Sequence, residues 1–242
     1  MHLDIPHPLA NLSVAEAKAI QASLADRVSL EDDPRLGDIR LVAGIDNAYL
    51  QTAAHTTSFA AVVVLSWPEL DEVEVATARD EVAFPYVPGL LSFRELPVVV
   101  AALQRLEQTP DLIFCDGHGL AHPRRFGLAC HVGLLAGVPT IGCAKRPLFA
   151  KYDDPDRELG ARTLMTMNGE PVGIALRTST RRKLPLFVSP GDRVSIDTAA
   201  ELALSAANGR YLPAPQERAH DTVTRLRAEP NSIQVVNGSS AQ

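Results

Sequence analysis

The 242-residue chain has few cysteines, few aromatic side chains and no long apolar run. Its three scattered cysteines do not form a disulfide framework, so we expect reduced core thiols and a cytoplasmic protein. No stretch approaches the roughly 18–20 consecutive apolar residues of a membrane span. The N-terminus has no basic segment followed by an apolar one, which argues against a secretory signal. Nothing in the sequence indicates an obligate dimer, and we expect a monomer.

Acidic residues are missing from two long segments, although the net charge of the chain is −6. Residues 117–152 and 171–191 contain nine of the 23 basic residues and none of the 29 acidic residues. Local potential, rather than net charge, attracts phosphate, so these segments can form a basic face on an acidic body. Chance clustering on a solvated surface is the alternative. The distribution favours binding of nucleic acid or phosphate.

Apolar periodicity indicates strands and helices packed in one domain. Ser13 and Glu16 have the spacing of a capping box and begin a helix expected over 13–28. Three strands with short connections then indicate an antiparallel meander, and helices alternate with strands after it. The expected strands are 39–50, 58–67, 71–82, 111–116, 139–144, 171–178 and 184–191, and the later helices are 93–108, 124–137, 197–209 and 215–227.

This order of elements predicts the α/β fold class, with a mixed sheet covered by helices on both faces. The connections are too short for separate domains, so a single domain is expected over 13–228. We expect residues 1–12 to be flexible and the polar tail, 229–242, to be disordered.

Two aspartates stand where apolar runs end. Asp46 follows "LVAGI" and Asp116 follows "LIFC", and functional groups of α/β sheets gather beyond the carboxyl ends of strands. A single such aspartate is often a turn or helix cap. Two on neighbouring strands can instead hold hard divalent ions, which prefer clustered carboxylate oxygens and assist phosphodiester hydrolysis. Glu95 is a third candidate, or else the partner of Ser92 in a capping box, against which Pro97 argues.

Three glycines, two histidines and two arginines crowd residues 117–127. His118 and His122 would suit zinc on a helix, but the glycines and Pro123 argue against a helix there. A glycine-rich loop lets backbone groups approach a flat ligand, and the start of a following helix suits phosphate. The sequence has no G-x-S-x-G motif and no Walker motif, which argues against a serine hydrolase or a P-loop protein.

A stiff segment of two prolines precedes Glu95. Its residues, Pro85, Tyr86, Val87 and Pro88, cannot lie in a central strand. They form either an ordinary surface turn or a wedge that pushes an aromatic or apolar group between stacked bases.

Four stretches, in their order along the chain, resemble the motifs of the endonuclease V family. They are "GIDNAY" (44–49), "FPYVPGLLSFRE" (84–95), "DGHGLAHPRRFGLACHVG" (116–133) and "PTIGCAK" (139–145). The resemblance implies a ribonuclease H-like fold and a Mg²⁺-dependent DNA repair endonuclease, with Mn²⁺ expected to substitute. It further implies a nick at the second phosphodiester bond 3′ to a deaminated adenine (hypoxanthine or inosine), which leaves 3′-hydroxyl and 5′-phosphate ends.

The same resemblance assigns roles to single residues. Asp46, Glu95 and Asp116 would hold the metal, and Lys145 would contact the phosphate at the cut. The strand-separating wedge would be Pro85, Tyr86, Val87 and Pro88, the pocket for the flipped base would be Gly89, Leu91, Gly117, Gly119, His122 and Gly127, and the phosphate contacts would be His122, Arg124, Arg125 and Lys145.

The C-terminal active-site position of the family falls on His220. Asp221 is the alternative, because Arg218 is shifted by one residue from the family's pattern. The substrate also stays open. A ribonuclease H-like nuclease that acts mainly on inosine-containing RNA or on branched DNA is one alternative, and a catalytically silent nucleic-acid-binding module is another, against which the three carboxylates speak. The sequence does not distinguish one metal ion from two.

Overall fold

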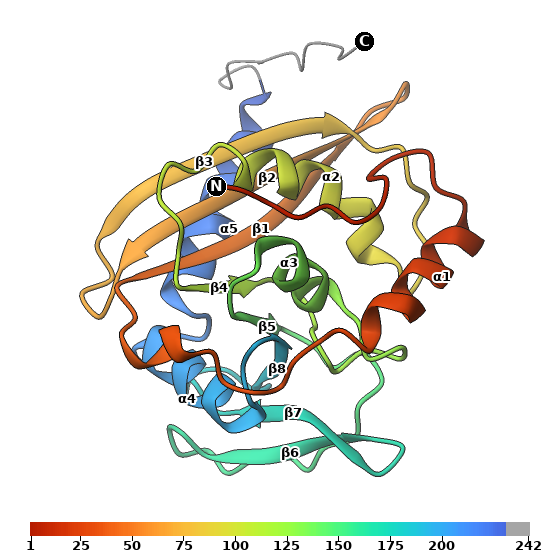
Figure 1. Cartoon of the computed structure of the whole chain (residues 1–242). Helices are drawn as coiled ribbons and strands as arrows, with labels where there is room; N and C mark the ends of the chain where they lie inside the picture. Colours follow the sequence, from red (N-terminus) through yellow and green to blue (C-terminus); the bar gives the residue numbers. More distant parts are fainter. Residues whose placement is uncertain (231–242) are drawn as a thin grey trace.

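The computed structural model describes residues 1–230, so most of the expected disordered tail (229–242) lies outside the described residues. At its centre is a mixed sheet of eight strands in the order β3-β2-β1-β4-β5-β8-β7-β6 (Figure 1). The strands are β1 (Leu41–Gln51), β2 (Thr56–Ser66), β3 (Glu72–Glu81), β4 (Leu112–Cys115), β5 (Thr140–Ala144), β6 (Arg162–Met167), β7 (Glu170–Leu176) and β8 (Leu186–Asp192). The helices are α1 (Val14–Ala25), the short 3-10 helix η1 (Pro34–Gly37), α2 (Leu91–Leu103), α3 (Leu128–Ala136), α4 (Ile196–Ala207) and α5 (Ala214–Ala228).

The strand order brings several strand ends to one edge of the sheet. β1, β2 and β3 form the expected antiparallel meander. β4 pairs in parallel with β1, and β5 pairs in parallel with β4, so β4 and β5 end at the same edge. β8 is antiparallel to β5 and begins there. We call this the carboxylate edge; it holds Asp46, Asp116, Lys145 and Pro185.

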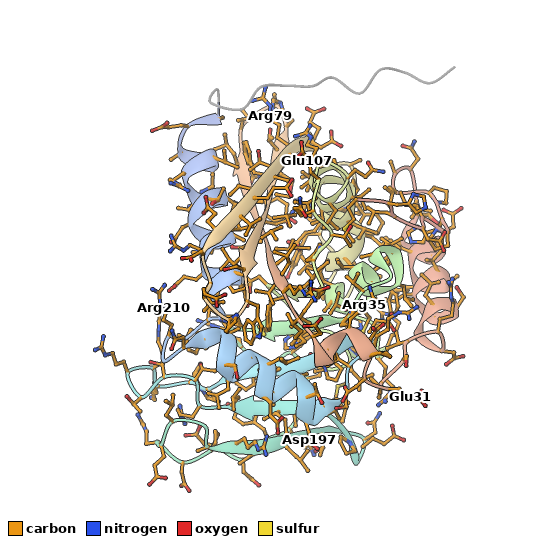
Figure 2. All side chains as sticks on the ribbon, turned by 60° about the vertical axis from the view of Figure 1, so that its left-hand side comes forward. Glu31, Arg35, Arg79, Glu107, Asp197 and Arg210 are labelled. Atoms are coloured by element: carbon orange, nitrogen blue, oxygen red, sulfur yellow. The ribbon has the colours of Figure 1, made fainter. Side chains whose placement is uncertain are left out.

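Helices cover both faces of the sheet, as the sequence predicts. α2 and α3 pack on the face to which Ala43, Ile45 and Ile113 point. α4 and α5 pack on the other face, to which Val42 and Phe114 point. In Figure 1, α5 runs behind β1 and β2, and α2 and α3 lie in front; Figure 2 shows side chains filling the spaces on both sides of the sheet.

The helix α5 lies very close to β1. A Cβ atom added to Gly44 would be 2.1 Å from the backbone of Pro215, so only glycine leaves room for the helix at this point. Because Gly44 is two residues before Asp46, this contact brings the first turns of α5 to the carboxylate edge.

Most predicted elements are present, with some shifted ends. The capping box of Ser13 and Glu16 opens α1, as predicted. α3 begins at Leu128 rather than at 124, because Arg125 has a left-handed backbone (φ 53°) that a helix cannot contain. β6 was not predicted; it is an outer strand with Leu164 more than half exposed, so its apolar alternation is weak.

The first seven residues pack along α2 and α3. Leu3 is buried, the backbone N–H of Asp4 donates to the carbonyl of Leu135 over 2.8 Å, and the Nε2 atoms of His7 and His131 are 2.7 Å apart. The flexibility expected for residues 1–12 stays a prediction. None of the helices within residues 1–230 has the length and apolar character that crossing a membrane requires.

Candidate active site

Asp46 and Asp116 lie side by side at the carboxylate edge. In the parallel pairing of β1 with β4, Ile45 is opposite Cys115, and the backbone N–H of Asp116 donates to the carbonyl of Ile45 over 3.1 Å. Each aspartate is therefore the next residue after a paired position. Both have the same parity as Val42 and Phe114, whose side chains point toward α5. Asp46, in the middle of β1, and Asp116, just after β4, are thus brought together on neighbouring strands, as expected.

Two side chains hold Asp116 from different elements. The ammonium of Lys145, just after β5, is 2.7 Å from Oδ2 of Asp116. The side-chain amide of Gln216, on α5, donates to Oδ1 of Asp116 over 3.1 Å and to the carbonyl of Cys143 over 3.0 Å. Gln216 is fully buried. Its role was not predicted from the sequence; the only signal is its place one helical turn before His220.

His220 reaches Asp46 from the same helix. Its Nδ1 atom is 2.6 Å from Oδ2 of Asp46, and its side chain is 49% exposed. Asp221 instead lines a groove beside the site, and the structure records no contact between it and Asp46. Of the two alternatives for the C-terminal active-site position, His220 is the residue that contacts a carboxylate of the site.

Glu95 approaches the site from the opposite face of the sheet. It lies in the second turn of α2, is buried, and accepts a hydrogen bond from the hydroxyl of Tyr49 over 3.0 Å. The residue that caps α2 is Leu90, with no side-chain hydrogen bond, so the capping-box alternative for Ser92 and Glu95 is wrong. Pro97 lies inside α2. Tyr49 was another residue that sequence reasoning did not single out, although "GIDNAY" contains it.

Two of the three carboxylates, Asp46 and Glu95, have raised pKa values. Burial raises the pKa of Asp46 to about 6, and the charge of Asp116 adds to the shift. Burial also raises the pKa of Glu95 to about 8, with further contributions from Asp46 and Asp116. Part of each shift is thus repulsion between the carboxylates. An added cation would relieve this repulsion.

The donor set suits a hard divalent cation in type, because such ions prefer carboxylate oxygens. Within residues 1–230, however, no three histidine, cysteine, aspartate or glutamate side chains are arranged to hold a metal ion as they stand. The reason is visible in the contacts: Lys145, His220 and Tyr49 each donate to one carboxylate. The negative charge of the site therefore suits a cation. The side chains of Lys145, His220 and Tyr49 have to turn away before the three carboxylates can bind one ion together.

The wedge segment and the glycine-rich loop meet at Gly89. The carbonyl of Gly89 accepts from Nε2 of His122 over 3.0 Å and from the guanidinium of Arg124 over 2.6 Å. Gly89 has φ +80°, which favours glycine. Tyr86 is 74% exposed on this segment, and Leu91 is partly exposed at the start of α2. Two segments of the predicted base pocket thus lie side by side, with the wedge residue in solvent.

His122 and Arg124 are engaged inside the protein. The Nδ1 atom of His122 is 3.2 Å from the backbone nitrogen of Arg124, and burial, aided by the Arg124 charge, lowers the pKa of His122 to about 4. Nε of Arg124 donates to the side-chain carbonyl of Gln21. Arg125 points toward β7, 3.0 Å from Glu170. Of the four predicted phosphate contacts, only Lys145 is at the carboxylates, and the role stays a prediction for all four.

The glycines of the loop serve different purposes. A Cβ atom on Gly119 would be 1.9 Å from the carbonyl oxygen of Pro190, and one on Gly127 would be 2.1 Å from that of His118. These two glycines permit close packing of the loop itself. Gly117, which follows Asp116, has no such neighbour but has φ +152°. His118 lies in the loop with Nε2 3.1 Å from the carbonyl of Arg146, so it forms no helical pair with His122.

Comparisons with known proteins identify the family of the chain. A sequence model of the endonuclease V family matches residues 22–221. The chain belongs to the endonuclease V family. Endonuclease V of Roseiflexus sp. is 46% identical over 201 residues, which cover 83% of this chain and 87% of that protein. The resemblance seen in the motifs is confirmed.

Solved structures of family members have the same fold. The crystal structure of endonuclease V from Bacillus subtilis superposes with a TM-score of 0.89 at 30% identity, covering 95% of this chain and 98% of that one. Endonuclease V from Ciona intestinalis, at 25% identity and a TM-score of 0.77, covers 90% of this chain and 99% of its own. It was solved in complex with a 24mer DNA that contains an inosine followed by a ribo-adenosine. The expected ribonuclease H-like fold is confirmed, and the protein is a hydrolytic endonuclease.

Proposed function

We propose that this endonuclease V family member uses Mg²⁺, or Mn²⁺ in its place, to nick DNA next to a deaminated adenine. The nick falls at the second phosphodiester bond on the 3′ side of hypoxanthine and leaves 3′-hydroxyl and 5′-phosphate ends for repair. The observation that carries the proposal is the group of two buried carboxylates, Asp46 and Glu95, and the partly exposed Asp116, with Lys145 and His220 beside them. The inosine-containing DNA bound by the Ciona relative supports the choice of substrate.

Each charged side chain of the site has a task in this reaction. Asp46, Glu95 and Asp116 would hold the divalent ion, which when bound makes a water more acidic and stabilises the leaving 3′ oxygen. Lys145, 2.7 Å from Asp116, offsets the charge that builds on the phosphate in the transition state. His220 uses Nδ1 toward Asp46 and keeps its half-exposed Nε2 available to orient or accept a proton from the attacking water.

Recognition of the base rests on the loop and the wedge. Deamination replaces the exocyclic donor of adenine with a carbonyl and places a proton on N1. Backbone N–H and C=O groups around Gly89 and Gly117 can complement both changes. Extruding a mispaired base costs only a few kcal/mol, and the exposed ring of Tyr86 can fill the gap that the base leaves. The three free, buried cysteines fit the expected cytoplasmic location.

The proposal is tested by mapping nicks at single-nucleotide resolution. Duplexes and single-stranded RNAs that each carry one hypoxanthine, with adenine-containing strands as controls, are incubated with the protein and Mg²⁺, Mn²⁺ or EDTA. We expect metal-dependent nicks at the second bond 3′ to hypoxanthine in DNA. Cleavage of RNA alone would transfer the activity to the RNA alternative, and cleavage of neither substrate would overturn the proposal.

A further inference from the structure

A groove of about 660 Å³ opens beside the carboxylates on the α5 side of the molecule. It begins at Lys145 and His220, the two side chains that contact Asp116 and Asp46. From there it extends to the loop between β7 and β8. The basic and aromatic residues that line it are Lys145, Arg146, Arg182, Lys183, Tyr211 and His220.

The strand order explains why this loop reaches the active site. β8 is antiparallel to β5, with Phe187 opposite Ala144, so the chain just before β8 lies beside Lys145. β7 ends next to the start of β8, with Leu176 opposite Leu186. We call residues 177–185, between β7 and β8, the basic loop. Along the carboxylate edge the charges therefore change sign, from the two aspartates to Lys145 and then to the basic loop.

Three cations of the groove are available to a ligand. Arg146, Arg182 and Lys183 are exposed and form no ion pair with any residue of 1–230. The groove also has two acids. Glu217 is paired with Arg210, and Asp221 is at the border with a second hollow that Arg218 and Arg225 line. Arg146, Arg182 and Lys183 thus face solvent without an ion-pair partner in residues 1–230, whereas Arg124 and Arg125 are bound by Gln21 and Glu170.

A fully buried arginine fixes the shape of the basic loop. The guanidinium of Arg177 donates to the carbonyl of Lys183 over 3.0 Å and lies within 3.5 Å of that of Arg182. On its other side it donates to the carbonyls of Pro155 and Asp156 over 2.8 and 3.1 Å. A buried guanidinium is stable only when its donors are satisfied. The guanidinium of Arg177 therefore ties the basic loop to the segment that contains Pro155 and Asp156.

Tyr211 joins the loop to the active-site strand. The guanidinium carbon of Arg182 lies 5.1 Å from the centre of the Tyr211 ring. The hydroxyl of Tyr211 donates to the carbonyl of Pro185 over 3.1 Å and is 3.4 Å from that of Lys145. These contacts hold the Arg182 side chain and the backbone of Lys183 in place before a ligand arrives, which reduces the entropy cost of binding.

We propose that this groove binds the phosphodiester backbone of the cleaved strand on the 3′ side of the cut. The inference rests on the proposed function. The wedge and Gly89 contact α1, α2 and the 117–127 loop, whereas the groove lies across the carboxylates on the side of α5. Since the lesion is 5′ to the cut, a strand that leaves its flipped base near Gly89 and crosses the carboxylates continues into the groove. Arg146, Arg182 and Lys183 then contact its phosphates.

The test combines a double variant with substrates of different 3′ length. Arg182→Gln/Lys183→Gln is compared with Arg27→Gln/Arg40→Gln, which removes the same charge from exposed residues at the opposite edge of the sheet. On a long hypoxanthine duplex we expect the groove variant to raise KM about 10-fold with little change in kcat. We also expect the slope of log KM against log salt to fall by about 1.4–1.8, because two phosphate contacts are lost.

Truncation of the substrate locates the contact. When the cleaved strand ends one nucleotide 3′ of the cut, the wild-type protein and the control variant should lose the affinity that the groove variant has already lost. Truncation on the 5′ side should affect all three proteins equally. An unchanged KM in the groove variant, or an equal response of all proteins to 3′ truncation, would overturn this inference alone. Failure of the wild-type protein to nick any hypoxanthine-containing strand would overturn the proposed function instead.

Discussion

The loop at 117–127 and the loop that follows β7 use their basic side chains in opposite ways. In the first, His122 and Arg124 are consumed by the carbonyl of Gly89 and by Gln21, so they build the loop. In the second, one buried residue, Arg177, satisfies the backbone carbonyls of the loop and leaves Arg182 and Lys183 free. A segment rich in basic residues therefore does not always form a basic surface. The cations that can bind a ligand are those that are not already bonded to carbonyl groups of the protein.

The largest expected effect comes from the carboxylates between these two regions. Asp116→Asn keeps the shape of the side chain but removes the charge that Lys145 and Gln216 contact and that a divalent ion needs. We expect the nicking rate to fall by about 10³-fold or more, which corresponds to a loss of several kcal/mol of transition-state stabilisation. Binding of the hypoxanthine duplex, measured by fluorescence anisotropy, should persist. A variant that nicks at more than a tenth of the wild-type rate would contradict the assignment of Asp116.

The second prediction tests the comparison of the two arginines directly. Arg177→Met leaves several buried carbonyls without a donor and should lower the free energy of unfolding by about 3 kcal/mol. Arg124→Met loses fewer and more exposed contacts, and should cost about 1–2 kcal/mol. Urea unfolding followed by circular dichroism gives both values. Equal stability of the two variants would show that the hydrogen bonds of Arg177 do not hold the loop between β7 and β8.

The third prediction concerns a residue with no charge. Gln216→Leu removes the amide that joins Asp116 to the carbonyl of Cys143, without changing the charge of the site. By analogy with groups that orient metal ligands, kcat should fall about 10–100-fold with KM nearly unchanged. Gln216→Glu serves as the contrasting variant. It keeps the size of the side chain but adds a negative charge, and should reduce kcat more. Steady-state kinetics at saturating Mg²⁺ distinguish these outcomes, and a rise in KM alone would contradict the role in orienting Asp116.

The fourth prediction concerns the free energy of unfolding of the metal-free protein, which should change only gradually with pH. Burial raises the pKa of Glu95 from 4.5 to about 8 in the folded protein, so the folded state keeps a proton that the unfolded state has lost. Stability from this residue is complete below pH 4.5 and is lost as pH rises toward 8, at no more than about 1.4 kcal/mol per pH unit. Thermal unfolding in EDTA across this range should show the decline. Glu95→Gln should flatten it, and an equally steep decline in that variant would assign the effect to another group.

How much the sequence predicts depends on whether a residue acts through its own strand or through a distant partner. Asp46 and Asp116 could be found because an apolar run ends before each of them, and parallel pairing then places them together. Glu95 reaches the site from a helix on the other face, and only the family motif favoured it as a metal ligand over a capping residue. The bonds from Tyr49 and Gln216 join residues far apart in the chain, and no local pattern records such pairs.

The same distinction explains the loops. The meander and the alternating helices followed from periodicity and turn lengths, which are local properties. The orientation of Arg125 depends on one left-handed backbone angle, and the burial of Arg177 depends on two loops that meet only after folding. Charge could be counted from the sequence, but its availability to a ligand could not.

The position of α5 has a consequence for the synthesis of the protein. Gln216 and His220, one turn apart on this last helix, hold Asp116 and Asp46, and the helix fits against Gly44. A growing chain on the ribosome contains all three carboxylates long before α5 emerges, but it lacks these two contacts and the wall of the groove. The active site is therefore assembled only after α5 has emerged and packed on β1.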